Sequence, residues 1–207
     1  MKKVLKERKV LLINCDVSSL VVDALCKRAA EENATVACFY FDFAAPKEQS
    51  TTAILGSVLK QVVRGLDEIP GEIKEAFQRE VSGGHRLVLS EIVELLRGIL
   101  SSRRTFICID ALDECQPRNR VKLLNSLNKI LPDSQGARIF LTGRPDIRGE
   151  VDKRLAKRAA TLSITPTRGD IITFLRAKLR EDTIPEEMNE GLEEEIVRDV
   201  PEKVSEM

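Results

Sequence analysis

Five short apolar runs alternate along the chain with longer segments in which apolar residues recur every three or four positions. The runs occupy residues 9–14, 34–43, 104–110, 137–142 and 160–164. Short runs that are apolar throughout are typical of strands covered on both faces, and parallel strands need crossover connections between them. The alternation therefore predicts an α/β domain in which a mostly parallel sheet is flanked by helices.

The intervening segments are predicted to be helices, most of them because their apolar residues fall on one helical face. They cover residues 18–31, 54–66, 70–81, 88–99 and 121–131. Beyond the last run, Thr167 and Asp170 form an S/T-x-x-D capping signature before a helix over residues 171–179. A weaker helical stripe follows and stops at Met207. We therefore expect a core domain over residues 1–165 and the truncated start of a helical subdomain over residues 166–207.

Charge balance and the lack of a long apolar run exclude several classes of protein. The 33 basic residues match 33 acidic ones, and a net charge of zero argues against a protein built mainly to hold nucleic acid or an anionic membrane. No apolar run approaches the ~18 residues needed to cross a bilayer. The five cysteines form no C-x-x-C pair, and several lie among strand-like apolar residues, which indicates reduced, buried thiols in a cytoplasmic protein. A single histidine, His85, argues against a zinc site.

Residues 106–114 (FICIDALDE) combine a buried strand with an acidic end. The apolar residues would deliver Asp110 to the exposed tip of the strand, where ligands bind in sheets of this kind. Asp113 and Glu114 add two carboxylates within one turn. The segment has the form of a Walker B motif, in which an aspartate organises a magnesium shell and a later acid polarises the attacking water. The alternative is a strand that ends in a polar, helix-capping turn.

Residues 138–145 (RIFLTGRP) combine a second predicted strand with polar residues at its end. Its tip would present the hydroxyl of Thr142 and the guanidinium of Arg144 to a terminal phosphate, because the planar fork of arginine suits phosphate recognition. Gly-Arg-Pro is also an ordinary turn sequence, so a purely structural interpretation stays open.

These two strand ends, with their spacing, carry a resemblance to a known family. The matching stretches are ACFYFDF (37–43), RTFICIDALDEC (104–115), RIFLTGRPDI (138–147), RGDIITFLRAKL (168–179) and IVRDVPEKVSEM (196–207). Through them the chain resembles the NACHT class of STAND P-loop NTPases, in its fungal NOD-like and nephrocystin-like branch. The resemblance implies a P-loop NTPase-like three-layer sandwich.

The resemblance also implies a ligand and roles for individual residues. The ligand would be ATP or ADP with Mg²⁺, with Asp110 as the magnesium aspartate and Asp113 or Glu114 as the water-polarising acid. Arg144 would be the first sensor, beside Thr142. Members of the class are nucleotide-controlled switches in signal transduction. We therefore expect flanking effector and repeat domains in a longer protein, and homo-oligomerisation on activation.

The P-loop itself is missing. The motif G-x-x-x-x-G-K-[ST] uses glycines to wrap backbone amides around phosphate and a lysine to reach the β- and γ-phosphates. Here the first glycine of the chain is Gly56, and no glycine is followed by lysine. The expected position, residues 14–18 within a degenerate region near residues 10–20, reads Asn-Cys-Asp-Val-Ser. Ser18 would stand where a magnesium-binding hydroxyl belongs, and Asp16 brings a charge of the wrong sign.

We therefore expect weak nucleotide binding or none, and little or no hydrolysis. Two explanations remain: a decayed site in a fold retained for contacts, or an incomplete copy of a longer gene. The competing functional hypothesis is a non-catalytic protein-interaction module that kept the fold and lost the nucleotide.

Overall fold

The computed structural model describes residues 9–14, 18–42, 49–83, 86–155, 158–163, 167–180 and 190–205. The chain divides into two compact units, Met1–Ser163 and Ile164–Met207. In the described part of the chain, no helix has the length and hydropathy needed to cross a membrane.

The first unit is built on a sheet of five parallel strands. They are β1 (Val10–Asn14), β2 (Thr35–Tyr40), β3 (Thr105–Asp110), β4 (Ala137–Thr142) and β5 (Ala159–Ser163). Their spatial order is β2-β3-β4-β1-β5, so β1 lies between β4 and β5. The predicted parallel α/β fold is confirmed, although β2 is shorter than the run over residues 34–43.

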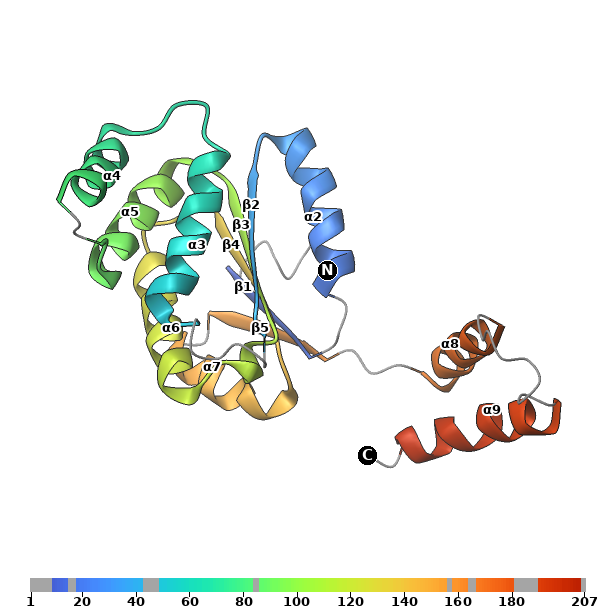
Figure 1. Ribbon diagram of the computed structural model, residues 1–207. Coiled ribbons are helices and arrows are strands. Elements are labelled where there is room, and N and C mark those ends of the chain that lie inside the picture. Colours follow the sequence, from blue (N-terminus) through green and yellow to red (C-terminus); the bar gives the residue numbers. More distant parts are fainter. Residues whose placement is uncertain are drawn as a thin grey trace. The chain divides into compact units, whose positions relative to one another are not determined.

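Helices cover both faces of this sheet. They are α2 (Ser18–Glu32), α3 (Thr51–Arg64), α4 (Gly71–Gly83), α5 (Leu89–Ser102), α6 (Pro117–Ile130) and α7 (Arg148–Arg154), with 3₁₀ turns η1 (Leu112–Glu114) and η2 (Pro145–Ile147). Figure 1 shows α2 on one face of the sheet and α3, α5 and α6 on the other, which gives the expected three-layer sandwich.

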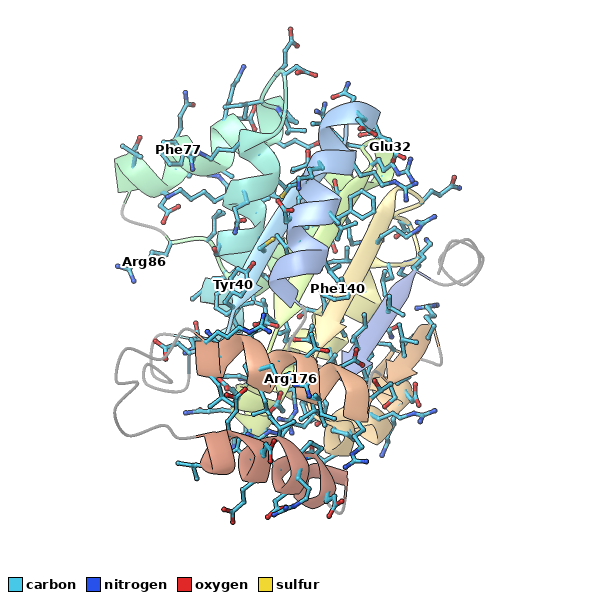
Figure 2. All side chains as sticks on the ribbon, turned by 90° about the vertical axis from the view of Figure 1, so that its right-hand side faces the viewer. Glu32, Tyr40, Phe77, Arg86, Phe140 and Arg176 are labelled. Atoms are coloured by element: carbon cyan, nitrogen blue, oxygen red, sulfur yellow. The ribbon has the colours of Figure 1, made fainter. Side chains whose placement is uncertain are left out.

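Two hydrophobic cores result from the alternation of side chains along each strand. The larger core packs Ile107 of β3 and Leu141 of β4 against α3, α5 and α6. The smaller core includes Cys108 and Phe140 and packs against apolar residues of α2. Figure 2 shows Phe140 on the side of the sheet that α2 covers. Of the cysteines in the described residues, Cys108 and Cys115 are buried, Cys38 is half-buried and Cys26 lies exposed on α2.

Helix α4 packs differently from the other helices of the first unit. Its buried residue is Ala76, whereas α3 and α5 each bury five or more residues. The side chain of Phe77 is 64% exposed and projects from α4 (Figure 2). This helix is therefore held by few apolar contacts.

The second unit contains α8 (Arg168–Arg180) and α9 (Glu190–Ser205). The predicted capping box is confirmed. The Thr167 hydroxyl accepts from the Asp170 amide at 3.2 Å, and an Asp170 carboxylate oxygen accepts from the Thr167 amide at 2.9 Å. Arg168 and Glu202 join the two helices at 3.6 Å, in an exposed ion pair that contributes little stability.

Candidate functional site

The carboxyl ends of β3 and β4 bring the first two candidate residues together. The two strands pair in parallel up to Ile109 opposite Leu141, so the next residues, Asp110 and Thr142, are neighbours at the strand tips. β3 is buried up to Asp110, which is half-exposed. The proximity of these two side chains follows directly from the parallel register.

The hydroxyl of Thr142 connects the two strand ends. It donates to Oδ1 of Asp110 at 2.5 Å and accepts from the backbone amide of Ala111 at 2.9 Å. Thr142 is only 3% exposed, so this hydroxyl needs both partners, because a buried hydroxyl without them would lose its hydration uncompensated. The network fixes the orientation of the Asp110 carboxylate.

The chain turns sharply after Asp110 because Ala111 has left-handed backbone angles, with φ 52° and ψ 48°. This conformation costs a residue with a Cβ roughly 1–2 kcal/mol. The fully buried side chain of Leu112 anchors the 3₁₀ turn that follows. The turn leaves Asp113 half-buried and Glu114 exposed, so of these two candidate acids only Asp113 faces the neighbouring strand end.

Asp113 contacts the chain after β4. Its Oδ1 accepts from the Arg144 amide at 3.3 Å, and its Oδ2 lies 3.3 Å from Nε of Arg144. The Arg144 side chain is 80% exposed, so this ion pair contributes little by itself. A Cβ on Gly143 would lie 2.6 Å from Cδ1 of Ile147 and 3.3 Å from Oδ1 of Asp113. A side chain at this position would therefore force Ile147 to shift.

Arg120, at the start of α6, supports the turn and is not singled out by the sequence motifs. Its guanidinium donates to the backbone oxygens of Asp113 and Cys115 at 3.2 and 3.1 Å, and to Glu150 at 2.8 Å. The sequence offers one indication that Arg120 points towards the rest of the protein. It lies one turn before the buried Leu124, on the same face of the helix. Burial raises the pKa of the neighbouring Cys115 thiol to about 11, which keeps it protonated and unreactive at neutral pH.

The exit of β1 is the position at which the P-loop would lie. β1 ends at Asn14 and α2 begins at Ser18, so residues 15–17 join them. Asp16 lies outside the described residues, and of Ser18 the structure describes the backbone, as the first residue of α2. A P-loop needs about eight residues with two glycines and a lysine for the same connection.

The residues present do not fit a magnesium–nucleotide complex. Asp110 and Thr142 offer the oxygen ligands that Mg²⁺ prefers, but Mg²⁺ is usually held by one or two carboxylates together with substrate phosphates. The connection after β1 has no glycine or lysine with which to hold those phosphates. Within the described ranges, no three acidic, histidine or cysteine side chains converge on a position that could hold a metal ion.

A family model described as Nephrocystin 3, N-terminal, matches residues 17–144. The match covers more than half of the chain and contains every candidate site residue identified from the motifs. It confirms the nephrocystin-like resemblance. No curated protein matches the sequence.

Several solved structures share the fold at low sequence identity. The Aeropyrum pernix ORC1 protein, solved in complex with DNA, is 17% identical with a TM-score of 0.53, over 84% of this chain and 44% of that one. Cdc6p of Pyrobaculum aerophilum is 14% identical with a TM-score of 0.51, over 83% of this chain and 43% of that one. A Walker-type ATPase of Pyrococcus abyssi is 14% identical with a TM-score of 0.50, over 98% and 62%.

The chain therefore spans about half the length of the solved structures that it matches. At these identities the likeness concerns the fold alone. It confirms the P-loop NTPase fold expected from the motifs.

Proposed function

Because the chain belongs to the Nephrocystin 3, N-terminal, family, we propose that it is a signalling module of a larger multidomain protein, in which a P-loop NTPase fold makes protein contacts without hydrolysing nucleotide. Its partners would be flanking effector and repeat domains and, on activation, further copies of the same protein. Nucleic acid is not among the proposed partners, because the net charge is zero.

The observation that carries this proposal is the short connection between β1 and α2. β1 pairs with β4 on one side and β5 on the other, so it is an interior strand, and it is the strand that the P-loop follows in this fold. The connection of residues 15–17 lacks both the length and the glycines of a phosphate cradle. The missing length and glycines therefore fall at the position where a P-loop would bind phosphate.

The expected loss of affinity is large. Micromolar nucleotide binding corresponds to about 8 kcal/mol. Hydrogen bonds that involve a charged group contribute roughly 1.5–3 kcal/mol each, so a missing lysine and two or three missing amides would remove about 4–12 kcal/mol. We expect a dissociation constant for ATP and ADP in the millimolar range or weaker.

A second candidate function is a nucleotide-controlled switch of the NACHT type. The contacts between Asp110 and Thr142 and between Asp113 and Arg144 favour it, because they unite the strand ends that would read a terminal phosphate. In that case Asp110 would hold Mg²⁺, Asp113 or Glu114 would polarise water, and Arg144 would be the sensor. ATP and ADP states would then present the flanking domains differently.

Calorimetric titration of the chain with ATP and with ADP in the presence of Mg²⁺ separates the two candidates. The Asp110→Ala variant is titrated alongside, and circular dichroism establishes that both proteins are folded. The proposed function predicts no saturable heat below millimolar nucleotide for either protein. Micromolar binding that Asp110→Ala abolishes would instead establish the switch.

A further inference from the structure

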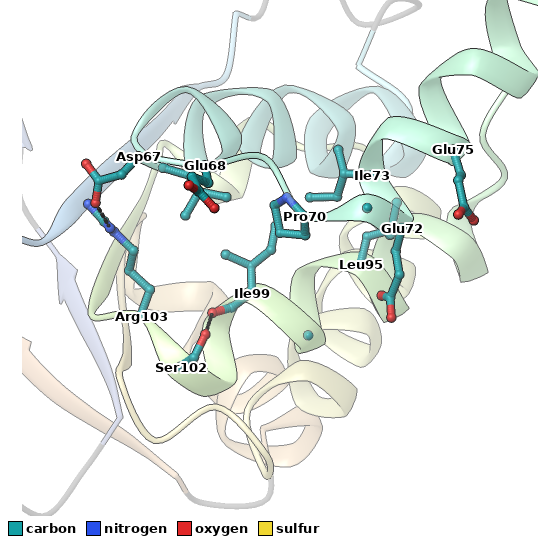
Figure 3. Close-up of a pocket in the computed structure, with 13 residues that line it drawn as sticks. Asp67, Glu68, Pro70, Glu72, Ile73, Glu75, Leu95, Ile99, Ser102 and Arg103 are labelled. Atoms are coloured by element: carbon teal, nitrogen blue, oxygen red, sulfur yellow. Dashed lines mark hydrogen bonds and ion pairs between the residues drawn. The ribbon is translucent and has the colours of Figure 1, made fainter.

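A groove of about 760 Å³ opens between α4, α5 and the segment that connects α3 to α4 (Figure 3). Its floor is apolar and is formed by Leu66, Pro70, Ile73, Leu95 and Ile99. Ser102 and Arg103, which also line it, lie just before the start of β3 at Thr105. Because the strands are parallel, the groove lies towards the edge of the sheet opposite the strand tips, away from the candidate nucleotide position.

The rim of the groove is strongly acidic. Four carboxylates line it, those of Asp67, Glu68, Glu72 and Glu75, against the single guanidinium of Arg103. Arg103 is already engaged, at 3.1 Å from Asp67 and 3.1 Å from Oδ1 of Asn33. Among the described residues, no ion pair or hydrogen bond occupies the side chains of Glu68, Glu72 and Glu75.

The wall that α4 provides is weakly held. Its main polar attachment to α5 is the ion pair of Arg79 with Glu91 at 3.4 Å, and a second hollow of about 440 Å³ lies beside that pair. Ile69, just before α4, and Phe77 on it are 43% and 64% exposed. The region thus combines an apolar floor, exposed apolar side chains and unpaired negative charge on one part of the molecule.

We propose that this groove binds a lysine- and arginine-rich amphipathic segment of a partner protein. An aliphatic or aromatic anchor of the segment packs on the floor near Pro70 and Ile99, and its basic side chains pair with the rim. Glu72 and Glu75 lie three residues apart on α4, and Glu68 lies on the segment before it, so basic residues repeated on one face of a helical partner can reach them. The charge of the rim favours this occupant over an acidic or purely apolar one.

This inference rests on the proposed function, since it names the chemistry of one partner of a protein-contact module. The two nevertheless fail separately. Micromolar nucleotide binding would overturn the proposed function and leave peptide binding unaffected. An empty groove would overturn only the inference made here.

The probe is a fluorescently labelled synthetic peptide of about 12 residues, with leucine on one helical face and lysine or arginine elsewhere. Two control peptides are used. In one, glutamate replaces the lysine and arginine residues, and in the other, serine replaces the leucines. Fluorescence anisotropy with the whole chain is expected to give a dissociation constant on the order of 10–100 µM for the basic peptide. At least tenfold weaker binding is expected for the other two, and for the basic peptide in about 0.5 M salt.

Gly98 allows the groove to be filled without disturbing the fold. It lies on α5 in the lining, and a Cβ added there would meet no atom within 4 Å. Gly98→Leu should abolish binding by occupying the groove, and leucine favours the helix more than glycine does. Gly149→Leu is the matched control, because Gly149 lies on α7 outside the groove and has equally open space. It should bind the peptide unchanged.

Charge reversal tests the rim. Glu68→Lys/Glu75→Lys should weaken binding at least tenfold. The control Glu31→Lys/Asp146→Lys changes the net charge by the same amount at exposed positions elsewhere, and it should weaken binding less than twofold.

The proposal is overturned if the basic peptide does not bind at about 1 mM, or if Gly98→Leu and Gly149→Leu bind it equally. It is also overturned if sedimentation shows that the chain self-associates and that Gly98→Leu alone abolishes this, because the occupant would then be a second copy.

Discussion

Replacing Thr142 with valine removes the hydroxyl that joins β3 to β4 while keeping the branched shape of the side chain. The change deletes two hydrogen bonds, one to the Asp110 carboxylate at 2.5 Å and one from the Ala111 amide at 2.9 Å. A bond to a charged group contributes roughly 1.5–3 kcal/mol, and one between neutral groups about 0.5–1.5 kcal/mol. Because Asp110 is half-exposed and regains water, we expect the lower part of the sum, a loss of about 2–3 kcal/mol of unfolding free energy.

The assay is urea unfolding of the whole chain, followed by far-ultraviolet circular dichroism. Thr142→Ser is the matched control, because it keeps the hydroxyl and loses one methyl group, which should cost about 1 kcal/mol. A double-mutant cycle with Asp110→Ala should give a coupling energy of about 1.5–3 kcal/mol between the two side chains. A loss below about 0.5 kcal/mol for Thr142→Val, or a coupling near zero, would refute the argument that this network is structural.

Three further predictions concern the turns and the second unit. Ala111→Gly should leave the free energy of unfolding in urea unchanged or raise it by up to about 1 kcal/mol, because the relief of left-handed strain exceeds the entropy cost of glycine. A loss of stability would contradict the assigned φ of 52°. Arg120→Met should lower the free energy of unfolding by about 1–3 kcal/mol in the same assay, and by less when it is made in the Glu150→Gln variant. Equal losses in the parent chain and in the Glu150→Gln variant would contradict the ion pair at 2.8 Å. Hydrogen bonds from the hydroxyl and the amide of Thr167 lower the pKa of Asp170 in the folded protein. The carboxylate therefore stabilises the start of α8 at pH values above its unfolded pKa of about 3.9, and this stabilisation is lost as the pH falls through its lower, folded pKa. The protection factors of the amides at the start of α8, which are corrected for the intrinsic exchange rate at each pH, should therefore fall in acid in the parent chain and should lack that acid dependence in Asp170→Asn.

The strands and the meeting of the strand tips could be predicted from the sequence because both depend on local pattern. Continuous apolar runs identify buried strands, and parallel strands place Asp110 and Thr142 at one edge. The end of β2 was less predictable. The run continues to residue 43, but the last amide to bond to β3 is that of Phe41, which donates to the Asp110 carbonyl at 3.3 Å. The next amide, that of Asp42, donates to Gln49 at 3.2 Å instead of extending the ladder.

Other features depend on contacts between segments that are distant in the sequence. The left-handed Ala111 has no local signal, because glycine would be the residue expected there. The close approach of Ile147 and Asp113 to Gly143 and the ion pair of Arg120 with Glu150 are contacts of this kind. Helix α7 was not predicted, because its seven residues bury only Val151 and so show no apolar stripe.

We propose that the fold has lost its phosphate cradle, and the effect of nucleotide on stability tests this proposal without depending on a binding enthalpy. Urea unfolding is measured in Mg²⁺ alone and with about 5 mM ATP added. With a dissociation constant of 1 mM or weaker, binding to the folded chain stabilises it by about 1 kcal/mol or less, whereas a dissociation constant of 1 µM gives about 5 kcal/mol. A gain below about 1 kcal/mol is the result we predict. A gain near 5 kcal/mol that Asp110→Ala removes would contradict the account and establish a working nucleotide site.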